Sequence, residues 1–472
     1  MPTREACHYD ASGIYVQPHG LPLGRLASVA ARLNALRQQV LHEAKRLAPA
    51  IALPPAAPVR PASPEHGTAG LTDAPAEGED AAGPAAAEPL TMLTWLLMRP
   101  CDVLRAYEIH RRQSELERVL TIARALSEEV DRLVVLGGGV AHAAAAAVFQ
   151  CCCHPYHNEL SGGERAGGPR LYFDGHHFDS DARAGILDLL PQRPSALKDQ
   201  RWGLIVSSAG SQAEAIKAAL AEYLPRLRQT CRSSEQLARR LIVIARPGDW
   251  LCRLVQEHAL GDVILLPPYS LVDSFGAATM LPLAAAGVDV VRYLRGAAAM
   301  TERFRSTALG LNPVLDLAGL SHLLATRNGF RRRVVAQSSR ALNGLATWWQ
   351  AFALAAQPSL GSGGQNMPEN AWEDTPAAAA RVAVGEAVQL MQLVVEHSRR
   401  TLEGWGDGTS ASLADRAAAV ENQLAEAARA AGMPLVRLLI PRASEACLGQ
   451  LMQLLPAIAL CEQLLETEPA QV

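Results

Sequence analysis

The sequence predicts an α/β fold in which parallel β-sheets are flanked by helices. Short apolar runs of strand length recur along the chain, and segments with helical periodicity separate them. This alternation is typical of β-α-β units, whose parallel strands are covered by helices on both faces. The chain has 472 residues, of which 49% are apolar, so it is long enough for two or three domains.

The first half of the chain contains most of the expected strands. Five apolar runs qualify, at 132–136, 170–173, 203–207, 241–245 and 263–266. Helices are expected around them, at 24–48, 114–130, 140–150, 179–190 and 213–224. The first of these strands is followed directly by three glycines and an alanine-rich helix, which makes it the clearest strand–turn–helix unit of the sequence.

The second half of the chain is richer in helix. Strands are expected only at 333–336 and 435–440. Helices are expected at 290–305, 317–327, 338–354, 412–432 and 449–465. Because helices again alternate with these strands, this half predicts a second α/β unit.

The chain is therefore expected to have four parts. They are an N-terminal helical segment at 1–50, a flexible linker at 51–93, a first domain at 94–300 and a second domain at 301–472. Within the linker, positions 51–90 hold eight of the 30 prolines and no aromatic residue. Such a segment has too little apolar surface to offset the entropy lost on ordering.

The charge balance excludes several classes of partner. Lysine and arginine total 44 against 47 acidic residues, a net charge of −3. Binding to nucleic acid or to an anionic membrane requires a basic field, so we expect neither. The nine cysteines are scattered and odd in number, and the N-terminus MPTREACHYD has no secretory pattern. We expect a reduced, cytoplasmic protein.

Two loops are candidates for binding a small anion. The first is Gly137-Gly138-Gly139, and the second runs from Ser207 and Ser208 through Ala209 and Gly210 to Ser211. Each follows an expected strand and precedes an expected helix, where backbone N–H groups are free to bind a phosphate. Serine and glycine also cap helices and form turns, and this interpretation carries equal weight.

The sequence gives no reason to expect a metal or a cofactor. The glycine run lacks the G-x-G-x-x-G spacing of dinucleotide sites, and no Gly-Lys-Ser/Thr loop occurs. His154 and His157 lie near Cys151, Cys152 and Cys153, but no C-x-x-C pair accompanies them. Structural zinc sites usually take spaced ligand pairs from two segments, so these residues are expected to pack as ordinary side chains.

Five motifs, in order along nearly the whole chain, carry a resemblance to a known family. They are the strand–glycine–helix text at 133–190, GLIVSSAGSQAEA at 203–215, SLVDSFGAATML at 270–281, LAAQPSLGS at 354–362 and LIPRASEACLGQLMQLL at 439–455. Together they resemble the bacterial glucose-6-phosphate isomerases. The resemblance implies two sugar isomerase domains and a role in glycolysis and gluconeogenesis. It also implies a homodimer and a small anionic sugar phosphate as ligand.

The resemblance also assigns positions to the binding site. Sugar phosphate is expected at Gly137, Gly138, Gly139, Ser207, Ser208, Gly210 and Ser211. Other family positions have changed. Val140 and Ala141 stand for a glycine and a serine, Ala209 and Gln212 for a serine and a threonine. Ser274 stands for an arginine, and the adjacent Asp273 is expected to face the ligand with a negative charge.

The groups that move protons in the family have no counterpart at the aligned positions. The family's basic glutamate corresponds to Gln357-Pro358, and its ring-opening histidine to the segment from Val388 to Met391. Its lysine would lie beyond Val472. A proton shift between C2 and C1 needs a general base, so no residue is expected to be catalytic. His397 or Glu386 could substitute only if this alignment is shifted.

Three hypotheses about function follow. The first is a glucose-6-phosphate isomerase, as the resemblance implies. The second is a non-catalytic homologue that binds a sugar phosphate or has a regulatory role. The third is a different enzyme in the same cleft, which would use His142, His154, His157 or Glu386.

Overall fold

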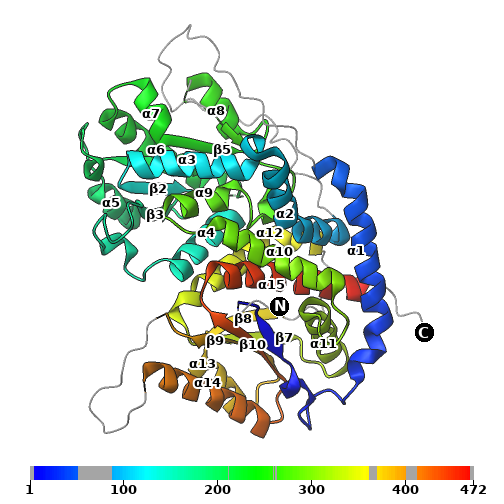
Figure 1. Ribbon diagram of the computed structural model, residues 1–472. Helices are drawn as coiled ribbons and strands as arrows, with labels where there is room; N and C mark the ends of the chain where they lie inside the picture. The colour runs from blue at the N-terminus through cyan, green and yellow to red at the C-terminus, as the bar shows by residue number, and fades with distance from the viewer. Residues whose placement is uncertain are drawn as a thin grey trace.

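The computed structural model describes residues 5–51, 88–210, 212–258, 260, 263–360, 369–399 and 412–467. Figure 1 shows two sheets at opposite ends of the molecule, with helices between them and over their outer faces. Each sheet has five strands. The predicted α/β fold is confirmed.

The first sheet is entirely parallel. Its order is β3-β2-β4-β5-β6, and every neighbouring pair runs in the same direction. The strands are β2 (Arg132–Leu136), β3 (Arg170–Asp174), β4 (Trp202–Ser207), β5 (Leu241–Ala245) and β6 (Val263–Leu265). All of β4 is buried, as expected of a central parallel strand with helices on both faces.

The second sheet is parallel except at one edge. Its order is β1-β10-β9-β7-β8. The parallel strands are β7 (Arg332–Gln337), β8 (Glu369–Asp374), β9 (Gln389–His397) and β10 (Leu435–Arg442). The edge strand β1 (His8–Asp10) pairs antiparallel with β10. The N-terminal segment is thus not only helical, because it also supplies a strand to the distant second domain.

The helices of the first half cover the first sheet. They are α3 (Glu115–Glu129), α4 (Gly139–Cys152), α5 (Ser180–Leu189), α6 (Ala213–Thr230), α7 (Ser234–Arg240), α8 (Trp250–His258) and α9 (Ala277–Ala285). The second half of the chain contributes α10 (Val290–Ser306), α11 (Pro313–Arg327), α12 (Gly344–Leu360), α13 (Thr375–Ala383), α14 (Leu413–Ala430) and α15 (Glu445–Thr467). Of these, α12 packs mainly on α4 of the first half. The N-terminal helices α1 (Ala30–Ile51) and α2 (Pro89–His110) lie along one side of the molecule (Figure 1).

Helices α10 and α15 lie between the two sheets and pack closely on each other (Figure 1). A Cβ atom at Gly296 would overlap the carbonyl oxygen of Ala446, and one at Gly449 would overlap that of Tyr293. Glycine at both positions lets the two backbones approach. Helix α15 is apolar and long enough to cross a membrane, but 94% of that stretch is buried in the protein core. It is therefore a core helix.

Two sequence expectations need correction in this part of the chain. Helix α2 begins at Pro89, inside the segment predicted as linker, and the expected linker at 52–87 lies outside the described residues. Strands β8 and β9 were not expected. Their sequences, ENAWED and QLMQLVVEH, place polar residues among the apolar ones.

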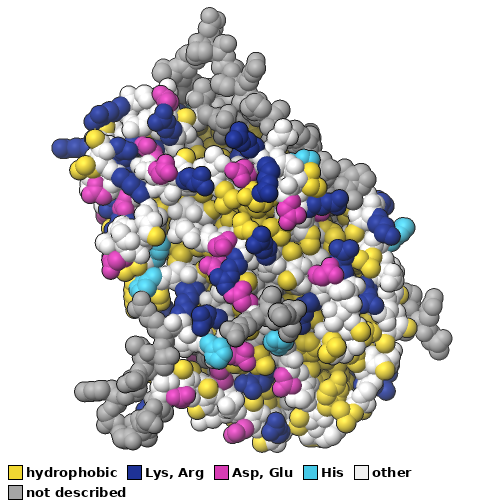
Figure 2. Space-filling view, in the orientation of Figure 1, with side chains coloured by type: hydrophobic (Ala, Val, Ile, Leu, Met, Phe, Trp, Pro, Cys, Tyr) yellow, Lys and Arg dark blue, Asp and Glu magenta, His cyan; other side chains and the backbone are white. Residues whose placement is uncertain are grey.

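The surface carries both signs of charge. On the face shown in Figure 2, the described lysine and arginine side chains are interspersed with aspartate and glutamate.

Candidate functional site

The two loops predicted to bind an anion lie side by side. Gly137 follows β2 and Ser208 follows β4, and these two strands are paired in the first sheet. Both loops therefore lie at the carboxyl edge of the sheet, where open α/β folds bind ligands. A Cβ atom at Gly210 would overlap the carbonyl oxygen of Gly138. The loops are thus in contact through their backbones.

Helix α4 begins at this contact. Gly139 has φ +69°, a left-handed conformation that favours glycine. In the described part of the chain, the backbone N–H groups of Gly138, Gly139 and Gly210 donate no hydrogen bond. These groups, two at the start of α4 and one in the loop before α6, are the donors that remain for an anion.

The other predicted donors are used within the protein. The N–H of Gly137 donates to the carbonyl of Asp174 (3.1 Å), and that of Ser208 donates to Ile244 (3.0 Å). The hydroxyl of Ser207 accepts from the N–H of Ala209 (3.2 Å). Both serines are buried, and Ser211 lies outside the described residues. Ser207 and Ser208 are therefore already hydrogen-bonded within the protein, without a ligand.

A carboxylate lies directly beside the serine loop. The hydroxyl of Ser208 donates to Asp249. Asp249 also accepts from the N–H groups of Arg246 (3.2 Å), Leu251 (3.0 Å) and Cys252 (3.1 Å), so it is fixed at the start of α8. A fixed negative charge at this place opposes the binding of a dianion. Asp249 is not among the site residues predicted from the sequence, although an aspartate before a helix is a recognisable capping signal.

Gln212 fills space between the two loops. A Cβ atom at Gly138 would overlap its Oε1, and one at Gly210 would come within 2.9 Å of the same atom. This oxygen is buried and has no hydrogen-bond partner among the described residues. An anion entering between the loops would have to displace or reorient this side chain.

Three histidines lie near the glycine turn, and the buried one, His142, is a poor proton carrier. The ring of buried His142 lies 5.0 Å from that of His176, which lies 3.9 Å from that of His177. The Nε2 atom of His142 lies 3.3 Å from the carbonyl of Val135. Burial, with His176 as a second cause, lowers the pKa of His142 to about 3. At neutral pH it is therefore uncharged and cannot act as a general acid.

Asp273 does not face the anion loops, contrary to the sequence expectation. Its carboxylate accepts from Nε of the buried Arg99 (2.9 Å), which also contacts Glu115 (2.7 Å). Ser274, which aligns with the family's arginine, accepts from Nε1 of Trp348 (2.9 Å). The expectation was wrong because the cation that neutralises Asp273 comes from a helix 174 residues earlier in the chain.

Gln357, which the sequence resemblance aligns with the family's base, lies at the end of α12. Gly344 at the start of α12 contacts Ala147 near the C-terminal end of α4, and α12 packs along α4. Its later turns therefore run back toward the glycine turn. Gln357, in the last of them, is exposed. A neutral amide at this place cannot accept a proton from a substrate carbon.

The two proposed substitutes are at opposite ends of the second sheet. Glu386 precedes β9 and accepts from Arg332 and Arg381 (2.7 Å each), and these arginines lower its pKa. His397 is exposed at the last position of β9. With eight residue steps along this strand, the two ends are separated by roughly 26 Å. Glu386 and His397 therefore cannot act on one sugar.

The remaining candidates are also dispersed. His154 is exposed, and its Nδ1 accepts from the N–H of Tyr156 (3.1 Å). His157 is buried, 3.1 Å from the carbonyl of Pro169. In β9, Gln389 bonds to Ser321 and Leu390 is buried, so the segment aligned with the ring-opening histidine is part of the core. Among the described residues, no group of three His, Cys, Asp or Glu side chains could hold a metal ion.

Comparison with known proteins agrees with this architecture. No family model matches the chain. Glucose-6-phosphate isomerase from Symbiobacterium thermophilum is 28% identical over 244 residues, 50% of this chain and 51% of that protein. The enzyme from Alkaliphilus metalliredigens is 23% identical over 245 residues, again 50% and 51%. The chain thus spans about half the length of the curated relatives it matches. It is a divergent relative of the glucose-6-phosphate isomerases.

Solved structures show the same fold over more of the chain. A hypothetical protein from Thermus thermophilus matches with a TM-score of 0.69 at 18% identity, covering 97% of this chain and 94% of its own. A glucose-6-phosphate isomerase from Chlamydia trachomatis matches with a TM-score of 0.56 at 14% identity, covering 77% and 70%. The two-sheet architecture is therefore an existing fold.

Proposed function

We propose that the chain is a member of the glucose-6-phosphate isomerase family that binds a sugar phosphate and no longer isomerises it. The observation that carries this proposal is the exposed amide of Gln357 at the family's base position. An aldose–ketose conversion moves a proton between two carbons, and each positioned acid or base contributes about 10²–10⁴ in rate. Without turnover, the protein has no enzymatic part in glycolysis or gluconeogenesis.

Binding is supported by three open N–H groups, two at the start of α4 and one in the adjacent loop before α6. Gly138, Gly139 and Gly210 present them at the carboxyl edge of the first sheet, where the helix dipole also favours an anion. Asp249 and Gln212 oppose this binding. We therefore expect a weak site rather than the tight phosphate loop of an active enzyme.

A coupled assay tests the loss of activity. Purified protein is given fructose 6-phosphate, and the glucose 6-phosphate formed is oxidised by an added dehydrogenase while NADPH is followed. We expect no rate above the protein-free control. Turnover that persists after repurification and depends on protein concentration would contradict the proposal.

Binding is tested separately, by thermal unfolding with 6-phosphogluconate or erythrose 4-phosphate at millimolar concentration. We expect a small stabilisation that inorganic sulfate at equal ionic strength does not reproduce. If neither sugar phosphate stabilises the protein, a structural or regulatory role without this ligand replaces the proposal. The internal bonding of Ser207 and Ser208 is the observation that favours this second candidate.

Cellular location and assembly belong to the same proposal. The near-neutral charge and unpaired cysteines fit a cytoplasmic protein, and the resemblance implies a homodimer. Light scattering at micromolar concentration measures the mass directly, and a monomer would contradict that part of the proposal.

A further inference from the structure

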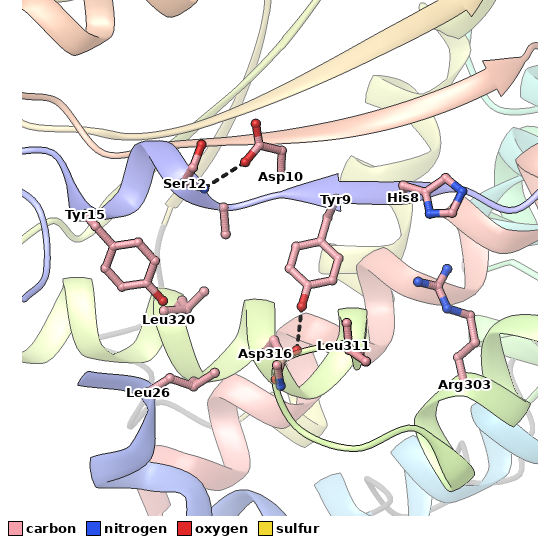
Figure 3. A pocket seen from close by; sticks show the side chains of 12 residues that line it. His8, Tyr9, Asp10, Ser12, Tyr15, Leu26, Arg303, Leu311, Asp316 and Leu320 are labelled. Carbon is pink, nitrogen blue, oxygen red and sulfur yellow. Dashed lines mark hydrogen bonds between the residues drawn. The ribbon is translucent and has the colours of Figure 1, made fainter. Parts of the chain in front are cut away.

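A cavity of about 420 Å³ lies beneath β1. Its lining residues are distant in sequence from both anion loops. Its walls come from the N-terminal segment, the end of α10 and the start of α11. In Figure 3, Tyr9 and Tyr15 point from β1 and the following turn toward α11, while Arg303 extends from α10 at the end of the cavity nearest His8. This volume falls within the range of small-molecule sites in proteins.

The cavity contains a cation without a carboxylate partner. Among the described residues, the guanidinium of Arg303 forms no salt bridge, and its one hydrogen bond goes from Nη1 to the carbonyl of Cys7 (2.6 Å). The side chain is partly buried, and burial lowers the pKa of Arg303. A partly desolvated arginine with free donors is a strong site for an anionic oxygen, because charge-assisted bonds gain strength away from water.

Two carboxylates also line the cavity. Asp10 is exposed and accepts from the N–H of Ser12 (2.9 Å), and the acceptors of Asp316 are already used. Asp316 accepts from the N–H groups of Gly310 and Asn312 (2.9 Å each) and from the hydroxyl of Tyr9 (2.5 Å). It therefore holds the loop before α11 in place. Its negative charge disfavours a ligand with two negative charges, such as a phosphate monoester. A singly charged ligand fits this combination better.

Apolar side chains gather at one end of the cavity, whereas His8, Asp10 and Ser12 are further polar residues of its lining. Tyr15, Leu26 and Leu320 form one wall, away from Arg303 (Figure 3). Leu311 also lines the cavity and is 70% exposed. The cavity thus has a cationic end and an apolar end.

We propose that this cavity binds a small amphipathic carboxylate: an organic monoanion with an aromatic or branched apolar body. Its carboxylate bonds to Arg303, and its body packs against Tyr15, Leu26 and Leu320. Because the walls come from β1, α10 and α11, the bound ligand ties the N-terminal strand to the second domain. The site is separate from the sugar-phosphate loops and does not depend on them.

Titration calorimetry with 3-phenylpropionate tests the charge requirement. The neutral 3-phenylpropanamide has nearly the same shape and serves as the matched ligand. We expect saturable binding of the acid and at least tenfold weaker binding of the amide, since a charge-assisted bond is lost. Equal affinity for the two compounds would overturn the proposal. So would the absence of detectable binding when the acid is present at about 10 mM.

Two pairs of variants locate the site. Arg303→Met should weaken binding of 3-phenylpropionate about tenfold or more. Arg305→Met, on the same helix but exposed, should leave it unchanged. In case Arg303→Met does not fold, Leu311→Asp, at an exposed residue of the lining, should weaken binding by repulsion, whereas Leu354→Asp, exposed on α12, should not. Binding that is insensitive to both Arg303→Met and Leu311→Asp would place the ligand elsewhere and overturn the proposal.

Discussion

The loops beyond the first sheet and the cavity beneath β1 differ in how their polar groups are used. At the loops, Ser207 and Ser208 are bonded within the protein, and Asp249 adds a fixed negative charge. In the cavity, Arg303 keeps donors free beside open space. The comparison shows that motif-like residues do not by themselves make a ligand site. What matters is whether the fold has already satisfied their hydrogen bonds.

The largest expected effect concerns Asp273. Asp273→Asn leaves the buried Arg99 short of one carboxylate, and breaking a buried ion pair costs about 3–5 kcal/mol. Urea unfolding should show this loss. Glu235→Gln, which breaks an exposed pair with Arg239, should change the free energy of unfolding by less than about 0.5 kcal/mol. If Asp273→Asn were equally mild, the residue would not have the structural role assigned here.

Gly210→Ala tests the contact between the two loops. Its Cβ atom would overlap the carbonyl of Gly138, so the free energy of unfolding should fall by about 1–3 kcal/mol. Gly185→Ala is the matched control, because that glycine lies in α5 with open space around it. It should be neutral or stabilising by up to about 1 kcal/mol. A tolerated Gly210→Ala would mean that the loops can separate, as a bound anion would require.

The buried His142 predicts a dependence of stability on pH. Its folded-state pKa of about 3 lies below the ordinary 6.5, so the unfolded chain binds a proton more readily. Its contribution is fully present above pH 6.5 and is lost as the pH falls toward 3. Between pH 6.5 and 5 the loss reaches at most about 2 kcal/mol.

Thermal unfolding over this pH range should therefore show a shallower slope for His142→Gln than for the unmodified protein. The exposed His154 provides the control, since His154→Gln should leave the slope unchanged. Identical slopes for all three proteins would show that His142 is reached by solvent and protonated in the folded state.

The smallest effect is expected at Asp249. Asp249→Asn removes the charge beside Ser208 while asparagine retains the ability to cap a helix. Binding of 6-phosphogluconate should strengthen about threefold to tenfold, equal to about 0.6–1.4 kcal/mol. Calorimetry measures this change. Asp289→Asn, at the cap of α10, is the control for a general change in charge. Unchanged affinity in Asp249→Asn would indicate that the anion binds away from the serine loop.

The sequence predicts correctly those strands that contain an uninterrupted apolar run. The strands of the first sheet are short apolar runs, and their ends correctly locate both loops. It was insufficient for β9, where Gln389 and Gln392 interrupt the apolar run. The structure buries both by bonding their amides to Ser321 and to the carbonyl of Glu421. Local propensity cannot reveal partners that distant parts of the chain provide.

The same limit applies to the candidate sites. Ser208 and Asp249 are 41 positions apart, and Arg99 and Asp273 are 174 apart. Neither pairing has a local signal, so the sequence could indicate the loops but not their internal bonding. The cavity beneath β1 joins residues from the N-terminal segment with others near positions 303–320, and no motif marks it.

The antiparallel pairing of β1 with β10 has a consequence for solubility. Removing the first few residues would leave β10, which reads LVRLLIPR, at the border of the sheet with unpaired backbone groups. Such borders recruit strands from other molecules and promote aggregation. The short N-terminal strand thus protects β10 from pairing with other molecules. Forms of the protein that lack β1 should precipitate at concentrations at which the full chain stays in solution.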